Sequence, residues 1–396
     1  MANQENNKEV LLHVENLCQY FGTVKAVDNV SFDVYKGEVF GLVGESGCGK
    51  TTTGRSIIRI YDITSGSIYF KGQRICAGTG SYVKAIKEAK KELRSNPDEA
   101  RKAELNQLIE ENRAAIQAAK HDHKKSDKDY ADKLVKEENE AFEAKKAAGN
   151  LTSEDEKKHK DALRIAKNTR LITQIQMIFQ DPVASLNPRM TVREIIAEGL
   201  IINGIKDQNY IDEKVYEILD LVGLTREHAG RYPHEFSGGQ KQRIGIARSV
   251  VMQPEMIIAD EPVSALDVSI QAQVINLLND LRDRLGLTIM FIAHDLSVVK
   301  YFSDRIGVMY FGNMVELATS EELFAHPLHP YTRSLLSAIP LPDPRKEKNR
   351  VRIKYDPVTD HDYGDEVPEM REVCPGHFVK CSEKEYHQYR KELGLE

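Results

Sequence analysis

The feature that most constrains the fold of this chain is a glycine-rich loop that follows an apolar run at residues 39–43. The loop fits the spacing G-x-x-x-x-G-K-[ST] and consists of Gly44, Glu45, Ser46, Gly47, Cys48, Gly49, Lys50 and Thr51. Glycines let the backbone curl so that successive N–H groups face phosphate oxygens. The lysine reaches the β- and γ-phosphates, and the threonine hydroxyl binds Mg²⁺. A helix predicted over residues 50–60 aims its N-terminus at the same anion. The sequence therefore predicts a P-loop nucleotide site.

The flanking sequence has the pattern of an α/β domain. Short apolar runs bounded by polar residues, as in buried parallel strands, occur at residues 176–179, 256–259 and 288–293. Residues 67–70 read as a further strand, and amphipathic helices are predicted at 191–202 and 212–222. After about Phe324 the composition shifts toward proline, histidine and charge, so we expect residues 326–396 to form a separate, less regular domain.

Residues 81–170 differ from the rest of the chain. They contain 22 Lys or Arg and 19 Asp or Glu among 90 residues, and they are rich in strong helix formers. Two apolar stripes at helical spacing are formed by Leu105, Leu108, Ile109, Ile116 and Ala119, and by Tyr130, Leu134, Ala141 and Phe142. The polar residues 121–125 between the stripes are expected to form the turn of a helical hairpin. The sequence thus predicts an inserted helical arm that packs on itself and need not share the core of the surrounding domain.

The composition excludes several classes of protein. A net charge of −6 does not indicate a nucleic-acid partner. The longest apolar run, residues 287–293, is far short of the roughly 20 residues that span a bilayer. Residues 1–9 lack an apolar signal core, so secretion is not expected. Five scattered cysteines favour a reducing compartment over a disulfide framework. Any membrane role is therefore expected to come through other chains.

Candidate catalytic residues follow two of the apolar runs. Asp260 ends one run, where its carboxylate can bind Mg²⁺ through water, and the adjacent Glu261 is placed to act as a general base. His294 ends another run and, taken alone, fits a core histidine as well as a catalytic one. Ser237, Gly238 and Gly239 precede a predicted helix, which gives a second anion site.

Five further motifs occur once each and in one order along the chain. Residues 178–182, 236–243, 257–262, 264–267 and 291–295 resemble the Q-loop, signature, Walker B, D-loop and H-loop of ATP-binding cassette (ABC) ATPases. The resemblance covers about residues 10–324 outside the arm. It implies an α/β P-loop NTPase fold with a RecA-like parallel sheet core, an antiparallel β subdomain and a helical signature subdomain at about 183–250. The implied division is 1–80, the inserted arm at 81–170, 171–325 and a C-terminal extension at 326–396.

The resemblance also implies a role for each motif residue. The implied nucleotide-binding residues are Phe21, Gly44, Glu45, Ser46, Gly47, Cys48, Gly49, Lys50, Thr51, Thr52, Gln180 and His294. Implied Mg²⁺-site residues are Thr51, Gln180 and Asp260, and the implied catalytic pair is Glu261 and His294. The signature residues Ser237, Gly238, Gly239 and Gln240, with Ser264 and Asp267 of the D-loop, are implied to meet the ATP of a partner subunit. Phe21 is the implied adenine-stacking residue, and Tyr20 competes for that role.

The tail resembles the C-terminal extension of oligopeptide and dipeptide importer ATPases, in particular their F-type subunit. The resemblance rests on His326–Thr332 continuing to Pro340, on residues 180–191, and on residues 369–377. It implies an ATP-hydrolysing subunit at the cytoplasmic face of the membrane. The implied partners are a second ATPase subunit in a heterodimer, two transmembrane permease subunits and an extracytoplasmic peptide-binding protein.

Several readings remain open at this point. Cys374 and Cys381 are too few for an iron–sulfur cluster, which normally needs four thiolates, but a metal shared with His377 remains an alternative. Other functions are a soluble ABC ATPase acting on DNA or ribosomes, and an importer of dipeptides or nickel. The arm is either a tolerated insertion or a docking arm for a regulatory or membrane partner. Cys48, beside a helix N-terminus, is expected to have a lowered thiol pKa and to react with alkylating reagents.

Overall fold

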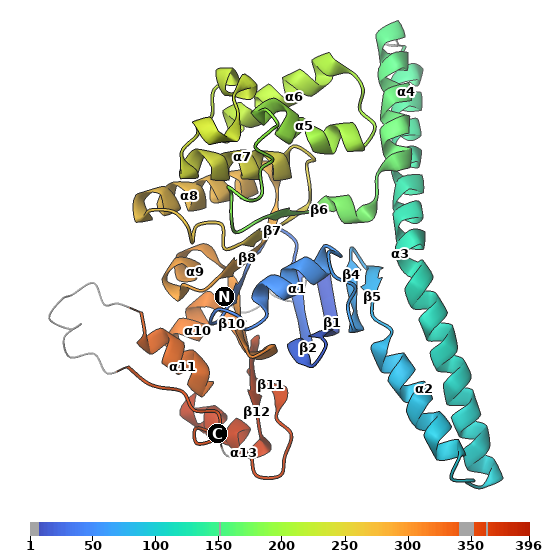
Figure 1. Ribbon diagram of the computed structural model, residues 1–396, viewed down its shortest axis with the longest axis vertical. Helices are drawn as coiled ribbons and strands as arrows, with labels where there is room; N and C mark the ends of the chain where they lie inside the picture. The colour runs from blue at the N-terminus through green and yellow to red at the C-terminus, as the bar shows by residue number, and fades with distance from the viewer. Residues whose placement is uncertain (1–7, 150–151, 340–351, 362) are drawn as a thin grey trace, which may run out of the picture.

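The computed structural model describes residues 8–149, 152–339, 352–361 and 363–396, so Pro340 of the tail motif lies outside the described residues. A central sheet carries helices on both of its faces, and a long helical arm runs along one side of the molecule (Figure 1). None of the described helices is both long and apolar enough to cross a membrane.

The central sheet contains the predicted parallel strands. Its strand order is β11-β12-β10-β9-β3-β8-β7-β6. The parallel strands are β3 (Val39–Val43), β6 (Ile175–Ile178), β7 (Met256–Asp260), β8 (Thr288–Ala293) and β9 (Arg305–Tyr310). Every residue of β3, β7 and β8 is buried, because helices cover one face of these strands and α1 with the second, antiparallel sheet covers the other. The carboxyl ends of β3, β7 and β8 carry the P-loop, Asp260 and His294, which therefore meet at one edge of the sheet.

A second sheet has four antiparallel strands in the order β2-β1-β4-β5. These strands are β1 (Val10–Phe21), β2 (Val24–Tyr35), β4 (Ser65–Phe70) and β5 (Gln73–Ala77). Its apolar face shares one buried cluster with one side of the central sheet, in which Phe32 and Phe40 stack at 5.1 Å. The helix after the P-loop, α1 (Lys50–Ile57), is enclosed between the two sheets.

Helices cover the remaining faces. The helical subdomain consists of α5 (Val192–Ile202), α6 (Gln208–Leu221) and α7 (Gly238–Val250), and the helices along the sheet are α8 (Val268–Leu285), α9 (Leu296–Phe302) and α10 (Ser320–Ala325). Two of these helices begin with reciprocal caps, in which Thr191 pairs with Glu194 and Ser237 with Gln240. The cap at Ser237 fixes the start of α7 at the signature motif.

The tail does not fold as the separate domain that its composition led us to expect. It forms α11 (Pro330–Ser337), β11 (Glu369–Cys374), β12 (His377–Cys381) and α13 (Glu383–Glu392). β12 pairs with β10 (Asn313–Thr319) through Glu316 opposite Val379, so the tail extends the central sheet. Tyr331 of α11 is 1% exposed and belongs to the main core. These two strands could not be predicted from the sequence, because β11 and β12 are short and only partly buried, so neither forms an apolar run.

The arm consists of α2 (Gly80–Leu93), α3 (Glu99–Ala147) and α4 (Ser153–Asn168). The turn predicted at residues 121–125 is wrong, because α3 continues through it for 49 residues. No glycine or proline interrupts this stretch, and its polar residues face a partner: Arg74 of β5 forms an ion pair with Asp122, and Ser126 Oγ donates to the Arg74 carbonyl at 2.9 Å.

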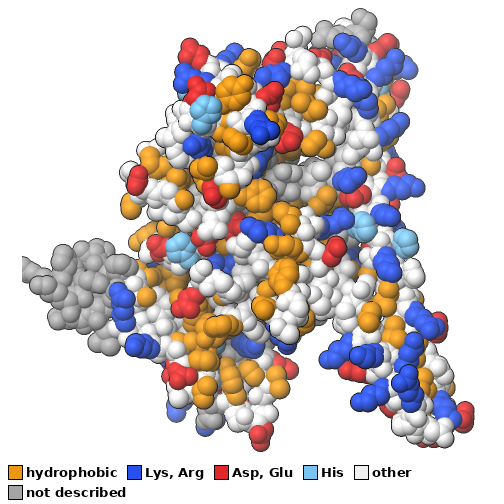
Figure 2. Space-filling view, viewed as in Figure 1, with side chains coloured by type: hydrophobic (Ala, Val, Ile, Leu, Met, Phe, Trp, Pro, Cys, Tyr) orange, Lys and Arg blue, Asp and Glu red, His pale blue; other side chains and the backbone are white. Residues whose placement is uncertain are grey.

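The arm also shares the core of the surrounding domain, contrary to our expectation. Tyr130 is 8% exposed and Leu134 is half-buried, and both pack on the apolar cluster beneath the antiparallel sheet. Further along the chain the Leu171 N–H donates to Asp127 of α3 at 3.1 Å. α2 and α4 pack instead against the two ends of α3, where charged side chains of both signs cover the visible surface (Figure 2).

Candidate active site at the P-loop

The P-loop wraps around the side chain of its own lysine. Lys50 is 4% exposed, and its ammonium donates to the carbonyls of Gly44 at 2.7 Å and Glu45 at 2.8 Å. Gly44 and Gly49 have φ angles of 149° and 108°, and a Cβ on either would lie 2.2 Å from a backbone carbonyl oxygen. Only glycine fits these two positions. The loop thus holds a buried cation and the N-terminus of α1 at one point, as a phosphate site requires.

Asp260 ends β7 next to this loop. One carboxylate oxygen accepts from the Thr51 hydroxyl at 2.8 Å, while the other is buried without a hydrogen-bond partner among the described residues. Burial raises the pKa of the Asp260 carboxyl above its usual range, and the bond from Thr51 offsets only part of this effect. A buried carboxylate oxygen without a donor, beside a threonine hydroxyl, fits the water shell of a magnesium ion.

Glu261 is held between the Q-loop and the H-loop. One of its oxygens accepts from Gln180 Nε2 at 3.0 Å and lies 3.0 Å from His294 Nδ1. Its backbone has a φ of 44°, a strained value for a residue other than glycine. The hydroxyl of Ser264, the first D-loop residue, donates to the Glu261 carbonyl at 3.1 Å. The structure thus brings the predicted base together with three residues that come from separate motifs.

The two aromatic candidates for the base of the nucleotide differ in their partners. Phe21 ends β1, is 45% exposed and meets Tyr61 edge-on at 5.2 Å, so one face of its ring is open. The Tyr20 hydroxyl donates to Asp28 at 2.5 Å, which ties that ring to the sheet. The geometry therefore favours Phe21 over Tyr20 for stacking.

The signature residues lie apart from the cluster around Glu261. In the described parts of the chain, no hydrogen bond links Ser237, Gly238, Gly239 or Gln240 to the P-loop, Asp260 or Glu261. A Cβ on Gly239 would lie 2.7 Å from the Ile270 side chain, so glycine is required for α7 to approach α8. Asp267 directly precedes α8, and its carbonyl accepts from the backbone N–H of Ile270 and Gln271 at 2.9 Å.

The expectation for Cys48 is wrong in its direction. Its side chain is 5% exposed, and burial raises the pKa of the thiol, an effect that the neighbouring Lys50 only partly opposes. The helix N-terminus does not compensate for the loss of water around the sulfur.

Sequence reasoning assigned no role to Tyr331. Its hydroxyl accepts a hydrogen bond from the backbone N–H of Glu45 in the P-loop at 2.9 Å. The two residues are 286 positions apart, and no local pattern marks the contact. The only available signal was that Tyr331 belongs to the tail motif.

Comparisons with known proteins agree with this geometry. The family model described as "ABC transporter" matches residues 27–144 and 141–264, and the model described as "Oligopeptide/dipeptide transporter, C-terminal region" matches 315–364. The oligopeptide transport ATP-binding protein OppF of Bacillus subtilis is 50% identical over 386 residues, covering 96% of this chain and 99% of that protein. The dipeptide transport ATP-binding protein DppF of Lactococcus lactis is 45% identical over 377 residues, covering 94% and 93%.

Solved structures agree on the fold. The cbiO1 protein from Clostridium perfringens, part of the ABC transporter complex cbiONQ, matches with a TM-score of 0.52 at 22% identity, covering 81% of this chain and 92% of that one. The ATP-binding cassette MJ1267 matches with a TM-score of 0.53 at 21% identity, covering 82% and 98%.

Fold and site together define an ABC ATPase, the nucleotide-binding and ATP-hydrolysing subunit of an ABC transporter. Within that class, the chain belongs to the family of oligopeptide and dipeptide transport ATP-binding proteins. Such a subunit is a component of an ABC transporter system with permease partners and is associated with the membrane.

Proposed function

We propose that this chain hydrolyses ATP to drive the import of peptides, and that it does so at the cytoplasmic face of the membrane. The observation that carries the proposal is the position of Glu261, whose carboxylate is held by Gln180 and His294 beside the P-loop. The peptide cargo is supported by the printed names of the full-length relatives and by the matched C-terminal region.

Each residue at the site has a proposed part. The P-loop backbone from Gly44 to Gly49, with Lys50, Thr51 and Thr52, holds the phosphates, and Phe21 stacks on the adenine. Thr51, Gln180 and Asp260 hold Mg²⁺, which neutralises phosphate charge when bound. Glu261 takes the proton of the attacking water, and His294 orients Glu261 and contacts the γ-phosphate.

The second half of each site is proposed to come from a partner ATPase subunit, most simply a different chain in a heterodimer. Ser237 is exposed at the N-terminus of α7, whose first N–H groups can bind an anion. Ser264 and Asp267 belong to the same proposed interface. Two permease chains and an extracytoplasmic peptide-binding protein complete the proposed transporter. ATP binding closes the pair of ATPase subunits, and hydrolysis reopens it.

The test uses the assembled transporter in lipid vesicles, with labelled oligopeptides, dipeptides and Ni²⁺ offered separately. We expect ATP-dependent uptake of oligopeptides or dipeptides. The Glu261→Gln variant should retain ATP binding and lose ~10²–10⁴-fold in turnover and uptake. The matched control is Glu255→Gln, because Glu255 directly precedes β7 whereas Glu261 directly follows it. This control should leave ATP turnover and peptide uptake unchanged. Uptake of Ni²⁺ alone, or binding to ribosomes without peptide uptake, would overturn the proposed cargo.

A further inference from the structure

A second cluster of metal-binding side chains lies in the tail, away from the P-loop. Glu322 of α10, Cys374 at the end of β11 and His377 at the start of β12 converge there. One carboxylate oxygen, the thiol sulfur and one ring nitrogen all lie within 4.8 Å of one another. The Glu322 oxygen is 3.6 Å from His377 Nδ1.

A tight hairpin sets the positions of the cysteine and the histidine. Cys374 and His377 are cross-strand partners on either side of Pro375 and Gly376. Gly376 has a φ of 77°, and a proline followed by a glycine with positive φ is typical of a type II turn. Residues directly opposite each other in a hairpin project to the same side, so the turn delivers a thiol and an imidazole together.

The imidazole of His377 is oriented as metal-binding histidines are. The side chain is fully buried, and its Nε2 lies 2.8 Å from a carboxylate oxygen of Glu316, which is also fully buried. Glu316 accepts N–H groups from Leu328 and His329 as well, so it is the acceptor and His377 Nε2 is the donor. This arrangement turns Nδ1 toward Glu322. Metal-binding histidines commonly donate their other N–H to a carboxylate in this way.

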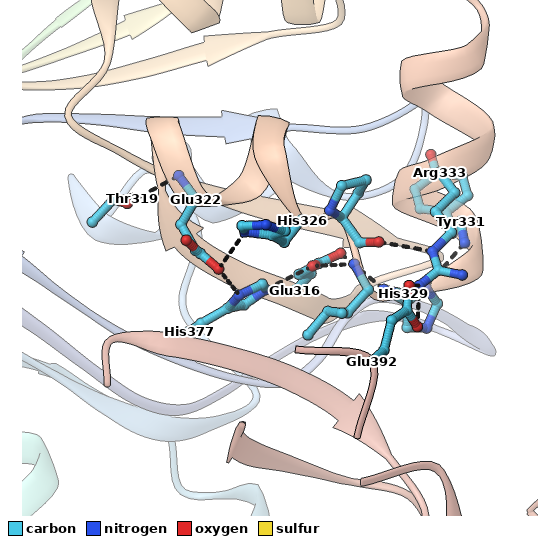
Figure 3. A network of polar contacts seen from close by, with 11 residues as sticks. Glu316, Thr319, Glu322, His326, His329, Tyr331, Arg333, His377 and Glu392 are labelled. Carbon is cyan, nitrogen blue, oxygen red and sulfur yellow. Dashed lines mark hydrogen bonds and ion pairs between the residues drawn. The ribbon is translucent and has the colours of Figure 1, made fainter. Parts of the chain in front are cut away.

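The nitrogen that faces the cluster has no other partner. His377 Nδ1 is buried and makes no hydrogen bond within the described part of the chain. A buried polar atom without a hydrogen bond costs free energy, so an occupant of the cluster would stabilise the fold. The carboxylate of Glu322 lies between the imidazoles of His377 and His326, and His326 Nδ1 is 3.1 Å from it (Figure 3).

We propose that Glu322, Cys374 and His377 bind one Zn²⁺ ion, with water as the fourth ligand. Thiolate, imidazole and carboxylate together are a ligand set that zinc prefers. Bonds of about 2.0–2.3 Å in a tetrahedron place ligand atoms roughly 3.3–3.8 Å apart, which the 3.6 Å between Glu322 and His377 already matches. The second cysteine of the tail, Cys381, is not a ligand, because it is fully buried among Val373, Val379 and Tyr389. Only one thiolate is therefore available, which fits a single Zn²⁺ ion rather than a cluster of metal ions.

Cobalt is the probe for this site, because a thiolate bound to Co²⁺ produces a charge-transfer absorption in the near ultraviolet. The experiment titrates Co²⁺ into the full-length chain, without a purification tag and without nucleotide, and then displaces it with Zn²⁺. We expect one Co²⁺ per chain with the thiolate absorption, and complete displacement by Zn²⁺.

Three variants place the ion. Cys374→Ser should remove the thiolate absorption, whereas Cys76→Ser, which alters another half-buried free cysteine, should retain it. Glu316→Gln should weaken Zn²⁺ binding by about 10–100-fold, the usual effect of changing the group that orients a ligand. The melting temperature and circular dichroism spectrum of each variant confirm that it is folded. Absence of the thiolate absorption in the unmodified chain, its persistence in Cys374→Ser, or its loss in Cys76→Ser would overturn the proposal.

Discussion

The hydroxyl of Tyr331 in the C-terminal tail accepts a hydrogen bond from the backbone N–H of Glu45 in the P-loop, at 2.9 Å. Tyr331 is 1% exposed and is packed by Tyr310 and Tyr355, with ring centroids 4.4 and 5.5 Å away. The same helix is fixed to β10, because Glu316 accepts the N–H groups of Leu328 and His329 just before α11. The tail therefore helps to fix the backbone of the phosphate-binding loop at Glu45.

Tyr331→Phe should weaken ATP binding without unfolding the protein. The change removes the acceptor for the Glu45 N–H and keeps the ring, so the loop loses one hydrogen bond of about 0.5–1.5 kcal/mol, or roughly 2–10-fold in affinity. Titration with a fluorescent ATP analogue measures the effect. Tyr355→Phe is the matched control, because its hydroxyl contacts His361 rather than the P-loop. Equal affinities for the two variants would show that the contact does not shape the loop.

Asp260→Asn should raise the melting temperature of the nucleotide-free protein. Burial raises the pKa of this carboxyl, so the folded state holds its proton more tightly than the unfolded chain does. The charged form therefore costs stability above the ordinary carboxyl pKa, and that cost is relieved as the pH falls through the folded-state pKa. The difference in melting temperature between variant and unmodified protein should be largest at neutral pH and shrink in acid.

The same variant tests the proposed magnesium role. Mg²⁺ should strengthen ATP binding by the unmodified protein, and the gain should disappear in Asp260→Asn because the water-shell acceptor is lost. A variant that gains as much affinity from Mg²⁺ as the unmodified chain would argue against Asp260 as a site residue.

Cys48 should react slowly with maleimides at neutral pH, although it lies in the nucleotide loop. Its pKa is raised by burial, so little thiolate is present, and the thiolate is the reactive form. In protein that has been stripped of bound metal, Cys374 is more exposed than Cys48 and should be modified first. Peptide mass spectrometry over time measures both rates, and the rate at Cys48 should rise with pH. Rapid modification of Cys48 that MgATP prevents would instead support a lowered pKa for this thiol.

How much was predictable from sequence differs between the site and its surroundings. The residues around Glu261 are marked by local motifs, and the parallel strands are marked by apolar runs, so both could be predicted. The pairing of β12 with β10 could not, because Glu316 and Val379 are distant in sequence and neither strand is apolar throughout. The course of α3 could not be predicted either. Polar residues such as Asp122 indicated a turn, but in the structure Asp122 lies within the helix and pairs with Arg74 at the edge of the antiparallel sheet.

The packing of the arm is tested by one pair of variants on α3. Tyr130 lies in the core cluster beneath the antiparallel sheet, with the Lys71 ammonium 5.9 Å from the centre of its ring. Tyr130→Ala should therefore lower stability by about 3 kcal/mol, as loss of a buried aromatic ring does. Leu108→Ala, on the same helix, removes a side chain that is 40% exposed and should cost less than about 0.5 kcal/mol. Thermal or urea unfolding of the full chain compares them.

Replacement of residues 80–166 by a short Gly/Ser linker extends this test to the whole arm. The sequence alone predicts that such a protein folds and binds ATP normally, because the arm would pack only on itself. The structure predicts a clear loss of stability, since the replacement uncovers the cluster around Tyr130 and removes both Asp122, which pairs with Arg74, and Asp127, which accepts the Leu171 N–H. Addition of ATP should recover part of that loss, because the P-loop contacts none of the removed helices in the described structure and a bound ligand stabilises the folded state. A replacement protein that melts at the temperature of the unmodified chain would show that the arm is a surface insertion, and its remaining role would then be to bind a partner.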